Sequence, residues 1–288
     1  MASLRDIRRR IRSVRNVAQI TKAMETVAAS RLRRAQEQVM ASRPFVHSME
    51  SILADLAGVS TDGETPALLQ VRPVKNTAVI LVSPNRGLAG PLPGNITRRA
   101  AQYVLHEAGS PVQIIAVGKK GRDFMLRRRQ QLLAEFTTLP DRPALGDIRP
   151  IAQIVTSGYA AQEFDRVTLI YTQFVSVVSQ QPVVKQLLPV EPPSHEAKAA
   201  ARDFIFEPSP AGVLEQLLPR YVETIIYQAQ LESTASFFAA QMVAMRNATD
   251  NAHEVIDNLT LTYNKVRQAV ITKEVAEIAA GAEAMAKS

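Results

Sequence analysis

Apolar positions near the start of the chain recur at intervals of three and four residues. The spacing continues for about 40 residues and is weakest at Thr21 and Glu25. Its members are Leu4, Ile7, Ile11, Val14, Ala18, Thr21, Glu25, Ala28, Leu32, Ala35, Val39 and Ser42. This heptad pattern predicts a coiled-coil helix. Ser3 and Asp6 resemble a capping box, so we expect the helix to begin near Leu4. We expect Pro44 to interrupt or kink it before the pattern resumes as far as Gly58.

A second helical pattern fills the last quarter of the chain. The stretch from Arg220 to Ala280 contains neither proline nor glycine, although the whole chain has 17 prolines and 12 glycines. As one helix it would be roughly 90 Å long. A helix of this length predicts a coiled coil. It does not predict a membrane span, because the stretch carries charges throughout. Its expected seam is Val255, Leu259, Thr262, Val266, Ala269, Lys273, Ala276 and Ala280, with a second apolar line at Ile271, Val275, Ile278, Ala282 and Met285.

Strand and helix patterns alternate between these two ends. Continuous apolar runs at 77–83 and 111–117 predict buried parallel strands, and helical patterns cover about 96–107, 119–130 and 147–161. Alternating residues at 166–174 and 181–188 predict a hairpin, and 203–206 reads as a short strand. We therefore expect an open α/β sheet with the hairpin at its edge.

The predicted fold class is α+β with long helices. We divide the chain into an N-terminal helix (1–58), an α/β domain (73–207) and a C-terminal helix (209–286). Because isolated amphipathic helices are marginal in water, we expect the two helices to pair antiparallel as a stalk. The longer helix would extend beyond the shorter one with apolar residues at its tip. We therefore expect a separate protein to surround that tip.

The positive charge of the chain is local. The formal net charge is +7, but residues 1–34 hold nine arginines and Lys22 against only Asp6 and Glu25. Arg8, Arg9, Arg10 and Arg12 are typical of a solvated coiled-coil face, or of a helix that passes an acidic or phosphate-bearing surface. A coiled-coil protein that binds nucleic acid or a membrane surface is therefore an alternative function. Such binding would weaken steeply with salt.

The sequence offers little for catalysis. There is no cysteine, which excludes disulfides and thiolate chemistry. The loop 86–90 and Gly118-Lys119-Lys120-Gly121 follow predicted strands but match no nucleotide-binding motif, so we interpret both as structural turns. His47, His106, His195 and His253 are scattered. We expect no catalytic, cofactor or metal site; the competing hypothesis of an α/β enzyme would require nucleotide binding. The absence of a signal peptide and of a long apolar run predicts a cytosolic protein.

Both ends of the chain resemble the gamma subunit of F-type ATP synthases of the bacterial type. The resemblance rests on 4–14 (LRDIRRRIRSV), 16–24 (NVAQITKAM), 242–251 (MVAMRNATDN) and 263–274 (YNKVRQAVITKE). Glu277-Ile278, Gly281-Ala282 and a form of the family's Arg-Gly-Leu-x-Gly loop at 86–90 add to it.

The resemblance implies an antiparallel coiled coil of the two termini with an inserted Rossmann-like α/β domain. It implies a non-catalytic rotor without a cofactor, present as one copy in a hexamer of three alpha and three beta subunits. The foot would contact the epsilon subunit and the c-ring, through which alone the protein would meet the membrane, at its cytoplasmic face. Proton flow would turn this shaft and drive ATP synthesis in the beta subunits. No nucleic acid is implied as a partner.

The resemblance also implies roles for individual residues. Lys22 and Met24 would lie near an acidic loop of the beta subunit, and Arg267 and Gln268 would hydrogen-bond a beta-subunit loop. Arg246, Asp250 and Asn251 would belong to the same beta-contacting region. For the foot, the implied contacts with the c-ring or epsilon subunit are Arg86, Phe204, Phe206 and Glu207. Without the resemblance, Arg267 would read as a solvated heptad flank.

The chain departs from the family pattern in the loop after the first strand. Ala89 replaces a common cysteine, and Pro91 and Pro93 crowd the turn. The cysteine-bearing insertion of chloroplast members is also missing, which excludes thiol regulation of that kind.

Overall fold

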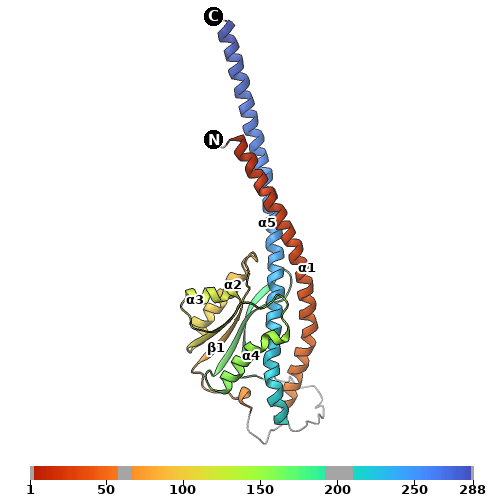
Figure 1. The fold of residues 1–288 in the computed structure, drawn as a ribbon, viewed down its shortest axis with the longest axis vertical. Helices are drawn as coiled ribbons and strands as arrows, with labels where there is room; N and C mark the ends of the chain where they lie inside the picture. The colour runs from red at the N-terminus through yellow and green to blue at the C-terminus, as the bar shows by residue number, and fades with distance from the viewer. Residues whose placement is uncertain (1–2, 58–65, 192–209, 287–288) are drawn as a thin grey trace. The chain divides into compact units, whose positions relative to one another are not determined.

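A computed structural model describes residues 3–57, 66–191 and 210–286 (Figure 1). The first and last elements of the chain are two long helices, α1 (Leu4–Ala57) and α5 (Pro210–Ala286). The remaining elements lie between them in the sequence. The chain packs as two compact units, one of Met1–Val27 with Met242–Ser288 and one of Ala28–Gln241. We call these the tip unit and the sheet unit, and each is described by itself.

A five-stranded sheet forms the centre of the sheet unit. Its strands are β1 (Thr77–Val82), β2 (Val112–Val117), β3 (Leu132–Phe136), β4 (Arg166–Phe174) and β5 (Gln180–Leu188), arranged in the order β3-β2-β1-β4-β5. The first four run parallel, with Ile80 of β1 aligned to Ile115 of β2 and Leu169 of β4. β5 is antiparallel to β4, which confirms the predicted edge hairpin. The strand order is that of a Rossmann-type sheet up to its fifth strand.

Helices cover both faces of this sheet, and all six residues of β1 are therefore buried. On one face, Val79 and Leu81 pack with Ile96 of α2 (Leu92–Gln102) and Met125 of α3 (Lys119–Arg127). A π-helical turn (Tyr103–Glu107) continues α2.

On the other face, Ile80 shares a core with Val155 of α4 (Leu145–Ala160), Leu53 of α1 and Val222 of α5. A short 3-10 helix (Ala67–Leu69) adds Leu68 to the same core. Residues 28–57 of α1 and 210–241 of α5 therefore belong to the sheet unit.

The predicted boundaries needed three corrections. α2 begins at Leu92 and not near Ile96, because Pro93 occupies the first turn, where its missing N–H costs nothing. Strand β3 was not predicted. Pro44 does not interrupt α1, and Pro219 lies inside α5, which begins at Pro210, next to the expected start at residue 209. Both prolines are exposed, and buried neighbours such as Met49 and Leu218 hold the two helices against the core. The strand expected at 203–206 lies outside the described residues.

In the tip unit, α1 and α5 pair antiparallel, as the pattern predicted. Arg8 contacts Tyr263, Thr21 contacts Thr249, and Glu25 contacts Arg246. Positions later in α1 thus meet positions earlier in α5, and the helix pair keeps one register over this length.

The predicted seam of α1 is confirmed, because every one of its members is buried or half-buried. The predicted seam of α5 is only partly right. Leu259 and Val266 are half-buried, but Val255 and Thr262 are exposed. The seam instead follows Met245, Thr249, Ala252, Ile256, Leu259, Tyr263 and Val266. Ile256 fits the same three-four spacing as Val255, so the pattern alone could not choose between them.

Beyond Val266, α5 continues past the N-terminal end of α1 (Figure 1). All described side chains from Arg267 to Ala282 are exposed. They include Ile271 at 50%, Val275 at 60% and Ile278 at 73%. The twenty residues from Arg267 to Ala286 span roughly 30 Å at 1.5 Å per residue.

Candidate partner-binding site

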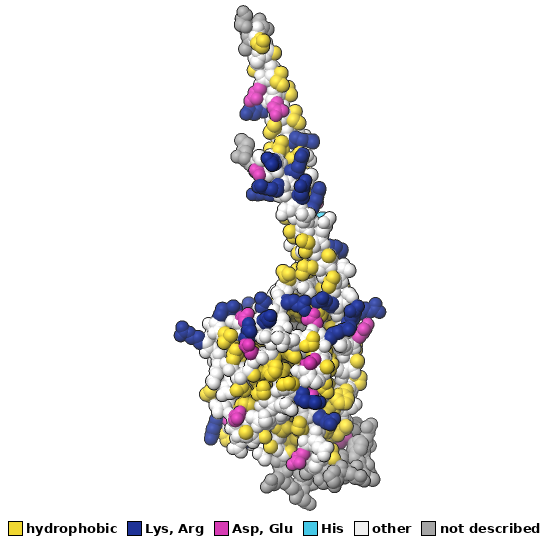
Figure 2. Space-filling model, viewed as in Figure 1, with side chains coloured by type: hydrophobic (Ala, Val, Ile, Leu, Met, Phe, Trp, Pro, Cys, Tyr) yellow, Lys and Arg dark blue, Asp and Glu magenta, His cyan; other side chains and the backbone are white. Residues whose placement is uncertain are grey.

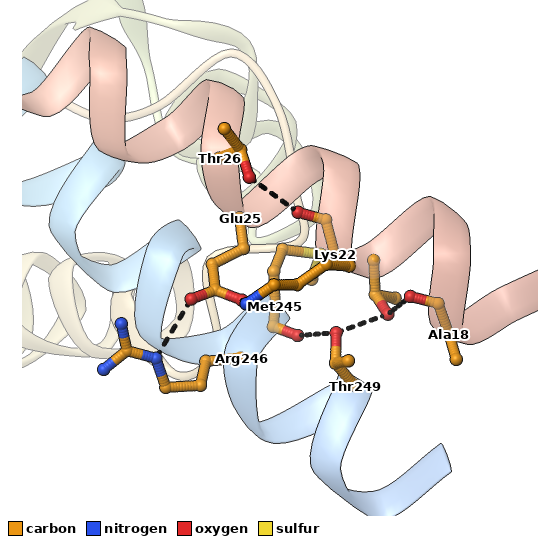
Figure 3. A network of polar contacts seen from close by, with 8 residues as sticks. Ala18, Lys22, Glu25, Thr26, Met245, Arg246 and Thr249 are labelled. Atoms are coloured by element: carbon orange, nitrogen blue, oxygen red, sulfur yellow. Dashed lines mark hydrogen bonds and ion pairs between the residues drawn. The ribbon is translucent and has the colours of Figure 1, made fainter. Parts of the chain in front are cut away.

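A layer of polar side chains crosses the seam of the tip unit (Figure 3). It consists of Thr21 and Glu25 from α1 and Arg246 and Thr249 from α5, and we call it the polar layer. The hydroxyl oxygens of Thr21 and Thr249 lie 2.7 Å apart. Each hydroxyl also lies within hydrogen-bond distance of a backbone carbonyl of its own helix. Thr21 is 3.1 Å from the Ala18 carbonyl oxygen, and Thr249 is 2.9 Å from that of Met245. The hydroxyl pair therefore has hydrogen-bond partners although it replaces apolar seam residues.

Glu25 is the buried charge of the polar layer, with a side chain only 8% exposed. Its Oε2 accepts a hydrogen bond from Lys22 Nζ at 3.0 Å, and its Oε1 accepts one from Arg246 Nε at 3.0 Å. The hydrogen bond from Lys22, followed by that from Arg246, lowers the pKa of the Glu25 carboxyl below its usual range. The carboxylate is thus ionised at neutral pH, with a cation on each oxygen.

The two cations are much more exposed than the carboxylate that binds them. The Lys22 side chain is 65% exposed and that of Arg246 is 60% exposed. Among the described residues, the two terminal nitrogens of the Arg246 guanidinium have no hydrogen bond, because only Nε is used. Lys22 and Arg246 therefore present positive N–H groups to solvent from two different helices.

The other residues expected near the beta subunit fall into two places. Met24 is half-buried beside the polar layer, and Asp250 and Asn251 are exposed one turn along α5. Arg267 and Gln268 are exposed at the end of the paired region. They lie about 32 Å from Arg246 along the helix axis. The structure therefore groups Lys22, Met24, Arg246, Asp250 and Asn251, and separates Arg267 and Gln268 from them.

The arginine-rich start of α1 is partly engaged with α5. Arg8 Nη2 donates to the Tyr263 hydroxyl at 2.7 Å, and its guanidinium carbon lies 5.5 Å from the centre of the ring. Arg9 pairs with Asp6 of its own helix at 3.1 Å. Figure 2 shows dark-blue side chains gathered around this end of α1, with yellow side chains along α5 beyond it. The tip unit thus combines a group of cationic side chains at the start of α1 with exposed apolar side chains on the last part of α5.

In the sheet unit, Arg86 is held by Asp141. Arg86 Nη2 donates to both carboxylate oxygens, at 2.6 and 2.5 Å, and Arg31 Nη1 of α1 donates to Oδ2 at 3.2 Å. Asp141 therefore joins the loop after β1 to α1. The predicted foot residues Phe204, Phe206 and Glu207 lie outside the described residues.

The loop after β1 lies where a dinucleotide-binding fold would hold a phosphate. The cavity beside Ser83, Asn85 and Arg86 has a volume of about 40 Å³. Small-molecule sites usually measure several hundred Å³, so this cavity holds no more than a few water molecules. A Cβ on Gly118, whose φ is +96°, would lie 1.9 Å from the Ser83 carbonyl oxygen. That glycine is needed for close packing of α3 against β1, as the structural-turn interpretation predicted.

Two other kinds of site are absent from residues 3–57, 66–191 and 210–286. There, no group of three or more histidine, aspartate or glutamate side chains is arranged to hold a metal. In the same ranges, no helix has an apolar run long enough to cross a membrane.

Two residues of the polar layer were missed at the level of sequence. Glu25 was noticed only as a weak point of the seam, and Thr249 was not assigned to a seam at all. Extending the three-four spacing backwards from Leu259 through Ile256 and Ala252 reaches Thr249 and then Met245. That extension would have placed a second polar residue opposite Thr21.

Comparisons with known proteins agree on one family. The ATP synthase family model matches residues 3–285. The chain is 52% identical to the "ATP synthase gamma chain" of Roseiflexus castenholzii, over 100% of both chains. It is 48% identical to that of Herpetosiphon aurantiacus, over 99% of both.

Solved structures are similar in fold. A chain of the Euglena gracilis mitochondrial ATP synthase, from a structure of OSCP, F1 and the c-ring, matches with a TM-score of 0.68 and 20% identity. It covers 98% of this chain and 94% of that one. A chain of the Tetrahymena thermophila central stalk and c-ring matches with a TM-score of 0.61 and 24% identity, over 80% and 99%. The chain therefore belongs to the ATP synthase gamma chain family, the rotor subunits of the central stalk.

Proposed function

We propose that this chain transmits torque between a proton-driven c-ring and a catalytic hexamer of alpha and beta subunits. One observation carries the proposal. The 77-residue helix α5 is paired with α1 along part of its length and then continues with exposed apolar side chains. A helix end of this kind needs a surrounding partner, and the central opening of a ring-shaped hexamer is a suitable one.

The helix pair suits torque transmission because both long helices are built into the sheet unit at one end. Leu53 of α1 and Val222 of α5 belong to the same core as Ile80 of the sheet. A twist applied to the sheet unit would therefore reach both helices together. A pair of helices resists bending and unwinding better than a single helix does, because an isolated helix is only marginally stable in water.

A rotating shaft must break and re-form its contacts with the surrounding hexamer of alpha and beta subunits. Those contacts should therefore be polar and easily replaced by contacts with the next subunit. Lys22 and Arg246 on one level, and Arg267 and Gln268 on another, meet this requirement because they are exposed. We propose that both levels contact the beta subunits. Met24, Asp250 and Asn251 flank the first level and belong to the same proposed contact.

The remaining partners follow from the same proposal. The sheet unit would contact the epsilon subunit and the c-ring, with Arg86, Phe204, Phe206 and Glu207 as proposed contacts. The solved relatives named above come from structures that include a c-ring. The chain would be peripheral, at the cytoplasmic face of the membrane, without catalytic activity of its own.

Co-expression with alpha and beta subunits from the same source tests this function. We expect one copy of the chain to elute with a hexamer that hydrolyses ATP. Changing Arg267→Ala together with Gln268→Ala should lower ATP hydrolysis by this complex more than the same change at two exposed residues of the sheet unit, such as Arg98 and Gln102. A chain that stays apart from the hexamer would contradict the proposal. Salt-sensitive retention of that free chain on an anionic polymer would then support the alternative binder.

A further inference from the structure

The polar layer holds one buried carboxylate, and the resemblance gives it no role. Glu25 is a buried carboxylate, and both of its oxygens are bound to cations that are themselves mostly exposed. Figure 3 shows that Lys22 and Arg246 approach this carboxylate from different helices. The arrangement places the charge inside and its two counter-charges outside.

We propose that Glu25 is a positioning residue that holds Lys22 and Arg246 together as a two-cation docking surface for an acidic segment of a partner protein. This inference rests on the function proposed above and assigns one of its contacts to a preformed structure. Because the cations come from α1 and α5, the surface exists only while the two helices are paired in register.

Glu25 restricts the conformational freedom of both cations. Lysine and arginine have long side chains, and ordering each of them on binding is unfavourable. Glu25 orders both before the partner arrives, through hydrogen bonds of 3.0 Å to Nζ and to Nε. The bond to Arg246 uses Nε, so both terminal nitrogens stay available for a bidentate contact with a carboxylate.

The cluster of Lys22, Glu25 and Arg246 is positively charged as a whole. Two cations and one carboxylate leave a net charge of +1 in this cluster, enough to attract an acidic group. Removing Glu25 would raise the net charge but release both cations from their positions. The same substitution would therefore weaken the ordering of Lys22 and Arg246 and strengthen the electrostatic attraction of an acidic partner. The two effects can be measured separately.

A purely structural role for Glu25 makes a different prediction. Replacing a buried ion pair by a well-packed apolar residue is often neutral or stabilising. Glu25→Leu would extend the apolar seam between Ala18 and Ala28, both of which are buried. If Glu25 only held the helices together, binding of the partner would change in step with the stability of the chain.

The experiment measures association and dissociation of the labelled full chain with the hexamer of alpha and beta subunits. For Glu25→Leu we expect dissociation about tenfold faster, consistent with losing the pre-ordering of two long side chains. Association should be unchanged or faster, because the net positive charge increases. The melting temperature of the isolated chain should not fall. Glu25→Gln, which keeps the shape and loses the charge, should lie between Glu25→Leu and the unaltered chain.

Two variants serve as matched controls. Glu37→Gln removes one carboxylate from the same helix, where it only pairs with exposed Arg33. It should leave dissociation unchanged. Thr21→Val removes a polar group from the seam without touching either cation, and Thr249 keeps its bond to the Met245 carbonyl. It should also leave dissociation unchanged.

The outcomes separate this inference from the proposed function. Equal dissociation rates for Glu25→Leu and the two controls would overturn the positioning role while leaving the rotor function intact. Faster dissociation that follows a lower melting temperature, with Thr21→Val showing the same effect, would assign Glu25 a structural role only. Failure of the unaltered chain to bind the hexamer would instead overturn the proposed function.

Discussion

The tip unit and the sheet unit are stabilised in different ways. In the sheet unit, large side chains such as Phe164, Ile80 and Tyr159 are completely or almost completely buried between layers. In the tip unit, the buried seam lies between only two helices and includes small or polar residues such as Ala18, Glu25 and Thr249. Burial of apolar surface thus contributes far more to the first unit than to the second.

This difference divides stability from recognition. Substitutions in the sheet unit should change the free energy of unfolding, because they remove packing. Substitutions on the outside of the tip unit should change binding, because few of those side chains pack against anything within the described chain. The predictions below test this division, from the largest effect on stability to the smallest.

Phe164→Ala should have the largest effect. The ring is 1% exposed and occupies space that a Cβ on Gly158 would enter, 2.2 Å from the ring. Truncation leaves a cavity in the core and should lower the free energy of unfolding by about 3–5 kcal/mol. Chemical denaturation measures this change. Phe45→Ala, at a 59% exposed position, is the control and should stay within about 0.5 kcal/mol. Equal effects of both substitutions would contradict the comparison.

Asp165→Asn should have an intermediate, pH-dependent effect. The carboxylate accepts hydrogen bonds from the backbone N–H of Lys75 at 2.8 Å and of Asn76 at 3.2 Å. The bond from Lys75 is the main cause of its lowered pKa. The amide keeps the shape but not the charge, so unfolding at pH 7 should require about 1–3 kcal/mol less.

The sign of the pH dependence follows from the lowered pKa of Asp165. Its stabilisation is complete above the unfolded pKa near 3.9, and it is lost as the pH falls through the lower folded pKa. Urea midpoints should therefore fall more between pH 5 and pH 3 for the unaltered chain than for Asp165→Asn. The same decrease in both proteins would show that Asp165 does not contribute to acid sensitivity.

Ile278→Ser should have the smallest effect on the isolated chain. The side chain is 73% exposed, so the free energy of unfolding should change by less than about 0.5 kcal/mol. In the complex with alpha and beta subunits the same substitution should weaken binding, because we propose that a partner covers this face. A large loss of stability without the partner, measured by thermal unfolding, would mean that the tip of α5 packs against its own chain.

The sequence was informative where one physical effect dominates. Strands β1 and β2 were predicted because buried parallel strands are continuously apolar, and the seam of α1 because its spacing extends over many turns. Strand β3 was missed because it is a short edge strand whose five residues are half-buried or exposed. Pro219 reads as a helix breaker in the sequence, yet α5 runs through it from Pro210. Only the core around Leu214 and Leu218 explains why the helix tolerates this proline.

The candidate site was predictable in part. Family motifs pointed to Lys22 and Arg246, but nothing in the local sequence states that Glu25 binds both of them. That contact joins residues 221 positions apart. The bridge from Asp141 to Arg31 and Arg86 likewise depends on tertiary structure, since the residues that it joins are 110 and 55 positions apart in the chain. Local patterns specify helices and strands, whereas such pairs arise only when the chain is folded.

The antiparallel register of α1 and α5 also has a consequence for biosynthesis. Thr21 meets Thr249 across 228 positions of sequence, so the first segment to leave the ribosome pairs with one of the last. Until then, the early half of α1 is an amphipathic segment with an uncovered apolar stripe. Contacts of such long range close late and slowly, and nascent chains that expose apolar surface are prone to aggregate. The sheet unit should therefore fold before the tip unit, and chaperones should act on this chain mainly before α5 is complete.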